Sequence, residues 1–152
     1  MRLEGGFLRV PGGQVELGGL SEGGRVGLNI DGDAFSLEFP DELARGDVAL
    51  VDGAQVNVAA GGGGNIRINA LKVDVLGGSA LTSGIAQGLG SVGSEAGDIE
   101  INATDLVTVS ESDIFNRVFG FGNGGDINIT ALSLEAINGT QLGASSSGQG
   151  NS

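Results

Sequence analysis

An alternating strand pattern, preceded each time by glycine, occurs three times in this chain. It is written as "GNIRINA" at 64–70, "GDIEINAT" at 97–104 and "GDINITAL" at 125–132. The equivalent residues Asn65, Asp98 and Asp126 are separated by 33 and 28 residues. The same two intervals separate a second set of apolar residues, Leu81, Ile114 and Leu142. A repeat with a period of about 20 to 50 residues predicts a solenoid.

An earlier unit can be aligned with this repeat. "DVALVDGAQVNV" at 47–58 matches "KVDVLGGSALTS" at 72–83 with a shift of 25 residues, and this shift defines three equivalent pairs, Val48 with Val73, Leu50 with Val75, and Val56 with Leu81. The chain therefore holds about four coils. In the coil from 65 to 83, apolar residues alternate with other residues in three short segments, and this period of two predicts three strands per coil.

Strands this short bury their apolar side chains only by stacking on the equivalent strand of the next coil. The sequence therefore predicts an all-β fold, a parallel β-helix with aliphatic columns running along it. One column contains Ile66, Ile99 and Ile127, and a second contains Ile68, Ile101 and Ile129. Strands about 4.8 Å apart make a rod on the order of 25 Å long from about five coils.

Several outward positions and turns follow from the same alignment. Arg67 is expected to face Glu100 across neighbouring coils. Asn69, Asn102 and Thr130 share one repeat position, and we expect side-chain hydrogen bonds between coils there. Glycines are expected at corners with positive φ. The longer interval contains "GIAQGLGSVGSEAG" at 84–97, which we expect to form a loop leaving one corner.

The composition excludes several classes of function. The chain of 152 residues has a net charge of −12 with seven basic residues, which disfavours binding to nucleic acid or to anionic lipid through charge. Cysteine, histidine, tryptophan and tyrosine are absent, so thiol chemistry, histidine catalysis and the best sugar-stacking side chains are absent as well. The sequence contains no apolar run of 18 or more residues, so it predicts no transmembrane helix.

Longer stretches of the chain resemble a known family. "GGQVELGGLSEGGRVGLNI" at 12–30, "FSLEFPDELARGDVALVDGAQVNVAAGGGGNIRINA" at 35–70, and the later "GDIEINATDLVTVSES" and "GDINITALSLEAINGTQLGASSSGQGN" are similar to filamentous haemagglutinin-type exoproteins of two-partner secretion, especially the Gly- and Asn-rich ones of cyanobacteria. The resemblance implies a right-handed parallel β-helix that is exported through a dedicated outer-membrane β-barrel transporter. It also implies a location in the medium or on the surface of a Gram-negative bacterium.

The resemblance further divides the chain into two continuous parts. Residues 1–60 are similar to the C-terminal part of a haemagglutinin-type secretion domain, and residues 61–152 are similar to β-helix repeat coils with units starting near 65, 98 and 126. The signal peptide and the first part of the secretion domain are not in this sequence. Because "GASSSGQGNS" at 143–152 reads as a linker to a further coil, we expect an internal fragment of a longer exoprotein that tends to associate end to end.

Three sets of polar residues are candidates for a chemical site. "FGNGGDINI" at 121–129 is similar to a calcium-binding nonapeptide, but aligning its Asp with Asp126 puts Asn128 at an apolar position. We therefore expect Asp126 to cap backbone N–H groups at a corner. The acidic residues Asp41, Glu42, Asp47 and Asp52, with Arg45 nearby, could serve a polysaccharide-processing enzyme, yet they are spread over turns.

The third set is the sequons "NAT" at 102–104, "NIT" at 128–130 and "NGT" at 138–140, which we attribute to the Asn- and Thr-rich repeat. We therefore predict no catalytic, cofactor-binding or metal-binding residue. The sequence predicts a secreted or surface-exposed structural protein of adhesin type, with the transporter as partner and with glycans or proteins of other cells bound through regions outside this sequence. A polysaccharide-processing β-helix enzyme and an intracellular repeat scaffold are the alternatives. The receptor and the choice between adhesion and toxin delivery stay open.

Overall fold

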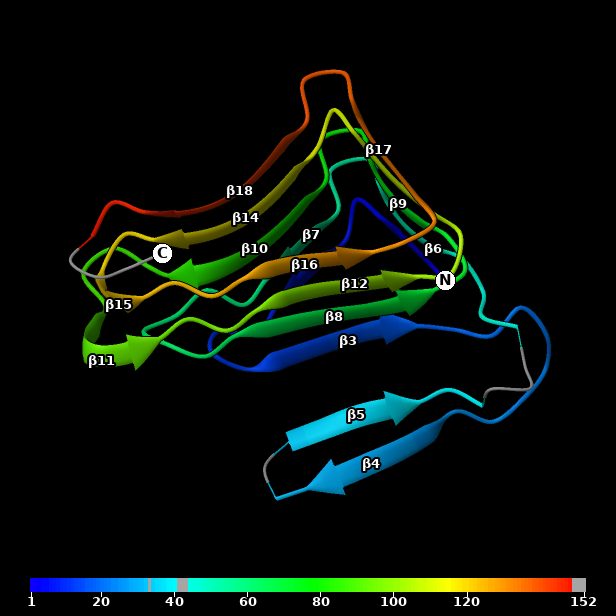
Figure 1. Cartoon of the computed structure of the whole chain (residues 1–152), viewed down its shortest axis with the longest axis horizontal. Coiled ribbons are helices and arrows are strands. Elements are labelled where there is room, and N and C mark those ends of the chain that lie inside the picture. Colours follow the sequence, from blue (N-terminus) through cyan, green and yellow to red (C-terminus); the bar gives the residue numbers. More distant parts are fainter. Residues whose placement is uncertain (33, 41–43, 149–152) are drawn as a thin grey trace.

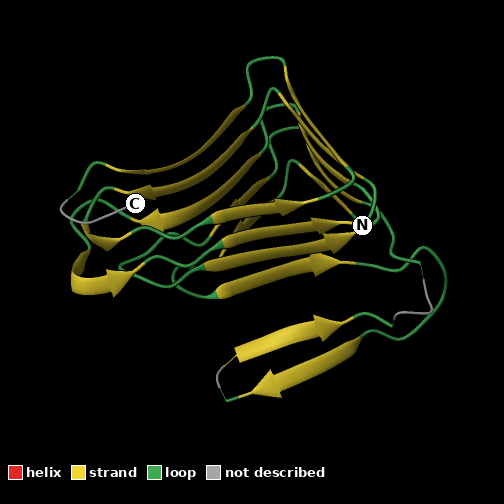
Figure 2. Cartoon of the chain, viewed as in Figure 1, coloured by secondary structure: helices red, strands yellow, loops and turns green. Residues whose placement is uncertain are grey.

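The computed structural model describes residues 1–32, 34–40 and 44–148, and within them every regular element is a strand (Figures 1 and 2). Three parallel sheets, which we name A, B and C, form the sides of the molecule. Sheet A has the strand order β1 (Arg2–Glu4), β6 (Val48–Val51), β9 (Val73–Leu76), β13 (Leu106–Ser110), β17 (Ser133–Ile137). Sheet B has the order β2 (Phe7–Arg9), β7 (Gln55–Asn57), β10 (Ala80–Ile85), β14 (Asp113–Val118), β18 (Gln141–Ser146). Sheet C has the order β3 (Gln14–Gly18), β8 (Asn65–Ala70), β12 (Ile99–Ala103), β16 (Ile127–Thr130).

The chain visits the three sheets in the same order in every coil. Strands β1, β2 and β3 are followed by β6, β7 and β8, and each strand pairs in parallel with its equivalent in the next coil. Figure 1 shows these coils as three-sided turns stacked on one another, with their corners aligned. The chain is therefore a parallel β-helix with three strands per coil, as the repeat predicts.

The register of sheet C confirms both predicted columns. Ile99 pairs with Ile66 and with Ile127, while Ile101 pairs with Ile68 and with Ile129. The columns also extend one coil earlier than predicted, because Val15 and Leu17 of β3 lie beside Ile66 and Ile68. Burying each of these side chains contributes about 1.5–3 kcal/mol, so the core gains its stability from many small aliphatic contacts.

Sheets A and B confirm the predicted alignment of residues 47–58 with residues 72–83. Val48 pairs with Val73 and Leu50 with Val75 in sheet A, and Val56 pairs with Leu81 in sheet B. Leu81 in turn pairs with Ile114, and Ile114 with Leu142. The spacing of residues along the chain therefore predicts the correct register in all three sheets.

One glycine shows why the run at 61–64 precedes a strand. Gly64 has φ +86°, and a Cβ at this position would clash with the carbonyl oxygen of Val58. Its positive φ turns the chain into β8 at the corner between sheets B and C, where only a residue without a side chain fits. The glycine run is thus a corner of the coil, not a linker.

The segment at 84–97 is not the loop that the sequence predicted. It contains β11 (Gly90–Glu95), which pairs in parallel with β15 (Phe121–Asn123) between sheets B and C. Ile85, Ala96 and Val118 form a second, small apolar cluster beneath this pair. The insertion is therefore folded back on the next coil, and the corner gains a short two-stranded sheet.

A second departure from the three-strand coil follows β3. Strands β4 (Gly27–Asp31) and β5 (Ala34–Glu38) form an antiparallel hairpin, with Leu28 opposite Leu37 and Ile30 opposite Phe35. Figure 1 shows the hairpin outside the helix, beside β3 at the edge of sheet C. The prediction of three strands per coil did not include it.

Candidate functional site

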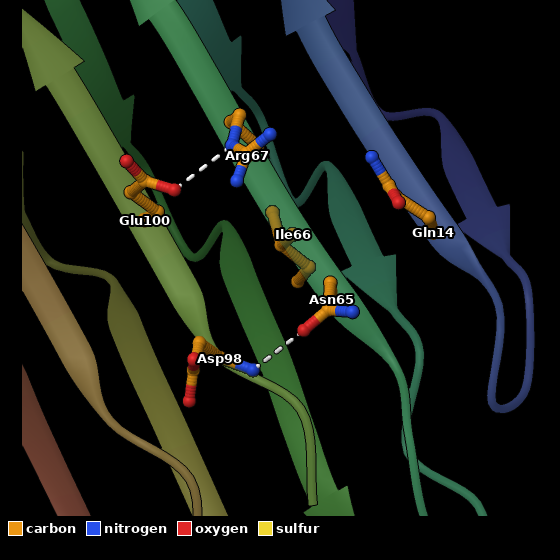
Figure 3. Close-up of a pocket in the computed structure, with 6 residues that line it drawn as sticks. All are labelled: Gln14, Asn65, Ile66, Arg67, Asp98 and Glu100. Carbon is orange, nitrogen blue, oxygen red and sulfur yellow. Dashed lines mark hydrogen bonds and ion pairs between the residues drawn. The ribbon is translucent and has the colours of Figure 1, made fainter. Parts of the chain in front are cut away.

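A polar groove lies on the outer face of sheet C, at the end where the hairpin projects. Because the inward positions of these strands are aliphatic, the alternate positions point outward and carry the polar side chains. Figure 3 shows one hollow of this groove, whose lining residues come from β3, β8 and the start of β12: Gln14, Asn65, Ile66, Arg67, Asp98 and Glu100.

The hairpin forms the second wall of the groove. A second hollow, of about 240 Å³, lies between the hairpin and sheet C and is lined by Gln14, Asn29, Asp31, Phe35, Ser36 and Arg67. The two hollows adjoin each other at Gln14 and Arg67, which line both, and we call them together the groove. The wall is held in place because Gln14 Nε2 donates a hydrogen bond to the carbonyl oxygen of Phe35 at 2.6 Å.

Arg67 and Glu100 form the predicted pair at the floor of the groove. Arg67 Nε donates to Glu100 Oε2 at 2.8 Å, and the two side chains are 40% and 37% exposed (Figure 3). The other carboxylate oxygen, Oε1, accepts from Asn102 Nδ2 at 2.9 Å. These contacts lower the pKa of Glu100, the Asn102 hydrogen bond most and Arg67 next. A carboxylate held ionised in this way is a weak proton acceptor at neutral pH.

The predicted amide ladder is confirmed between two of its members and continues to the hairpin. Asn102 Nδ2 donates to Asn69 Oδ1 at 3.4 Å, and Asn69 Nδ2 donates to Glu16 Oε1 at 3.1 Å. The second oxygen of Glu16 accepts from the backbone N–H of Leu37 at 3.0 Å. Thr130 holds the equivalent register position on β16. One polar network therefore joins the hairpin to three successive coils.

The corner caps lie one coil earlier than predicted. Asn65 Oδ1 accepts from the backbone N–H of Asp98 at 2.9 Å, and Asp98 Oδ1 accepts from the backbone N–H of Asp126 at 2.8 Å. The prediction named Asp126 as the cap, but Asp126 supplies the N–H and its predecessors supply the oxygen. The repeat position was correct, because each side chain caps the coil that follows it.

Of the acidic residues named from the sequence, only Asp47 and Asp52 are described, and they lie at opposite ends of β6. Asp41 and Glu42 lie outside the described residues. Asp47 and Arg45 line a hollow near the N-terminus, with the Arg45 guanidinium 5.8 Å from the centroid of the Phe39 ring. Asp52 instead sits at the corner after β6, with φ +56°.

The described residues contain no group of three or more Asp, Glu, His or Cys side chains arranged to hold a metal ion. In the described part of the chain there is also no helix long and apolar enough to cross a membrane. Of the sequon residues, Asn102 uses its amide nitrogen in the ladder, and Asn138 donates to Ser110 Oγ at 3.0 Å.

The groove was not predicted from the sequence, because one of its walls is the hairpin and the hairpin was not predicted. A signal was present: Asp31-Gly32 is flanked by alternating apolar residues, Leu28 and Ile30 before it and Phe35 and Leu37 after it. This pattern is the strongest short-range indication of a β-hairpin. Asn29, Asp31 and Ser36 could then have been assigned to a wall, although its position against sheet C could not.

Comparison of the chain with known protein families, with curated proteins and with solved structures gave no match in any of the three. The fold and the groove therefore define the class: this is a parallel β-helix protein with a polar groove on one sheet.

Proposed function

We propose that this chain is a secreted or surface-exposed structural β-helix protein of adhesin type, exported by a two-partner secretion system. The observation that carries the proposal is the uninterrupted stack of three parallel sheets, because a repeat of this kind extends by adding coils and can hold a binding region away from a cell. The likeness of residues 12–30 and 35–70 to haemagglutinin-type secretion domains supports the export route.

The outer surface supports a structural role. In sheet C the outward side chains bond mainly to one another between coils, through the Arg67–Glu100 pair and the Asn69–Asn102 ladder. Such contacts fix the register of neighbouring coils and satisfy the polar groups that face away from the core. The partner in export is an outer-membrane β-barrel transporter, and the location is the medium or the surface of a Gram-negative bacterium.

Export is tested by producing the chain, joined behind a cleavable secretory signal and the first part of a haemagglutinin-type secretion domain, in a Gram-negative host with and without the two-partner transporter that serves that domain. We expect the chain in the medium only when the transporter is present. A matched culture with an unrelated outer-membrane barrel controls for leakage. Equal amounts in the medium of all cultures, or retention in the periplasm in all of them, would contradict the proposal.

A second candidate function is favoured by one observation, the joining of several carboxylates and one basic residue in a single groove. Asp98 and Glu100 lie with Arg67 in one hollow, and Asp31 lines the adjoining one. This arrangement is expected of a β-helix enzyme acting on acidic polysaccharides. The lowered pKa of Glu100 weakens the case, because a carboxylate held ionised by Asn102 and Arg67 is a weak proton acceptor.

The two functions are separated by an assay on oligogalacturonates with and without calcium. We expect no cleavage product. Turnover that Arg67→Gln abolishes and Arg9→Gln leaves unchanged would establish the enzyme instead, since both substitutions remove one positive charge and Arg9 lies outside the groove.

A further inference from the structure

A second hollow, unrelated to the groove, lies on the outer face of sheet B. Its lining comes from three successive coils, those that contain β7, β10 and β14, and includes Thr82, Gln87, Phe115, Arg117 and Phe119. Its volume is about 280 Å³, close to the lower end of the range for small-ligand sites. Most of the lining is apolar, and Arg117 is the one charged side chain among these lining residues.

The hollow arises from a step in side-chain size between neighbouring coils. The outward positions of β14 carry large side chains, Phe115 and then Arg117, and Phe119 comes directly after the strand. In the register of sheet B, Thr82 lies beside Phe115 and Gly84 lies beside Arg117. A Cβ on Gly84 would clash with the Arg117 backbone, so this position stays without a side chain. The large side chains of β14 therefore form one side of the hollow, and the smaller residues of β10 form its base.

Arg117 is oriented as an anion-binding group. Its guanidinium carbon lies 3.2 Å from the centroid of the Phe115 ring, which fixes the plane of the group against the aromatic face. Stacking leaves the N–H groups at the edge of the guanidinium available for in-plane hydrogen bonds. Arg117 takes part in none of the three ion pairs among the described residues. Bidentate recognition of a carboxylate is the interaction that this geometry favours.

The remaining lining residues indicate the rest of the ligand. Phe119 is 52% exposed and lines the hollow, so its ring is accessible to the C–H face of a sugar. Thr82 and Gln87 add polar groups that can bond to hydroxyls. We propose that this hollow, which we name the Arg117 pocket, binds a carboxylated sugar, with the carboxylate on Arg117 and the sugar face on Phe119.

The net charge of −12 opposes an anionic ligand at long range, but charges beyond about 8 Å are largely screened at physiological ionic strength. The contact with Arg117 then decides binding. This proposal is independent of the export route, because it concerns only the outer face of sheet B.

The test uses the full chain, labelled with ¹⁵N, and methyl β-glucuronide as the probe. We expect saturable amide shifts within residues 82–87 and 115–119. Methyl β-glucoside, which has the same ring without the carboxylate, is expected to bind at least tenfold more weakly, as is acetate, which has the carboxylate without the ring. Benzoate tests for an aromatic carboxylate in place of a sugar.

Two variants locate the interaction. Arg117→Gln should weaken glucuronide binding about tenfold or more, the effect of losing a charge-assisted hydrogen-bonded contact. Arg9→Gln is the matched control, because it removes the same charge from the outer face of sheet B on β2, outside the pocket, and should change binding less than twofold. Phe119→Ala should weaken binding about three- to tenfold. The amide spectrum of each variant shows whether the fold is retained.

The proposal fails if the glucoside or acetate binds as tightly as the glucuronide, if benzoate binds more tightly, or if the shifts lie outside the two ranges. It also fails if folded Arg117→Gln binds like the original chain.

Discussion

The columns of sheet C and the hairpin β4–β5 use the same apolar alternation with opposite results. In the columns, Ile101 is fully buried between Ile68 and Ile129. In the hairpin, Leu28 and Ile30 alternate in the same way but are 59% and 68% exposed. The difference is that each column residue has an equivalent in the next coil at the strand spacing, whereas the hairpin pairs only with itself. Apolar alternation is enough to form a strand, but the apolar side chains are buried only where equivalent strands stack.

The edges of the two regions differ as well. Strand β8 is paired on both sides, with β3 and β12. Strand β5 pairs with β4 on one side, and on the other its backbone is met by the side chains of Gln14 and Glu16. The hairpin is therefore attached to the helix by a few polar contacts, and its stability depends on them.

The largest expected effect breaks a column. Ile101→Asp places an unpaired charge in the core and should lower the free energy of unfolding by several kcal/mol. Ile30→Asp, the same substitution at the exposed hairpin position, should change it by less than about 1 kcal/mol. Urea unfolding of both variants measures the contrast. Equal shifts of the midpoint in the two variants would show that Ile101 and Ile30 do not lie in different environments.

A corner glycine should have the next largest effect. Gly64→Ala forces a Cβ against the Val58 carbonyl at positive φ and should cost about 2–4 kcal/mol. Gly32 of the hairpin also has a positive φ, +61°, but a Cβ added there would meet no atom within 4 Å beyond its chain neighbours. Gly32→Ala should therefore cost about 1–2 kcal/mol, the conformational term alone. Thermal unfolding distinguishes them, and a larger loss for Gly32→Ala would contradict the packing at the corner.

Removing the link between the regions should be a smaller and local effect. Glu16→Ala deletes the acceptor for the Leu37 N–H and for Asn69 Nδ2, which should cost about 1–2 kcal/mol. Hydrogen exchange should speed up at residues 27–32 and 34–38 and stay unchanged at 99–103. Glu16→Gln retains one side-chain oxygen and should restore part of the protection. Uniform deprotection along the chain would argue against a separately attached hairpin.

The smallest expected effect is the pH dependence from Glu100. Its pKa is lowered in the folded chain, so its contribution to stability is present above the ordinary value of 4.5 and is lost as the pH falls through the folded pKa. Because the pair with Arg67 is more than a third exposed, the contribution should stay below about 1 kcal/mol. Carboxyl NMR titration should show the pKa of Glu100 rise in Asn102→Ala and in Arg67→Gln, because each substitution removes a contact that lowers it. An unchanged pKa in both variants would contradict the contacts.

The sequence predicted the parts of the fold that repeat and missed those that occur once. Ile66, Ile99 and Ile127 were placed correctly because equal spacing in the chain becomes equal register in a solenoid. Strand β11 was missed because Gly90–Glu95 contains one apolar residue, Val92, and its pairing with β15 depends on the next coil. The groove was missed for the same reason, since its second wall occurs once in the chain.

The solenoid can be read from the sequence: the period fixes which residues stack, and the alternation fixes which face inward, because a strand has only two faces. The Arg67–Glu100 pair and the Asn69–Asn102 ladder follow from the same register. The folded chain was needed to place the hairpin and to show which side chains meet across coils outside the repeat, such as Gln14 with Phe35 and Arg117 with Phe115. These contacts depend on the path of the chain between strands and on side-chain rotamers. Neither repeats from coil to coil, so the sequence repeat does not predict them.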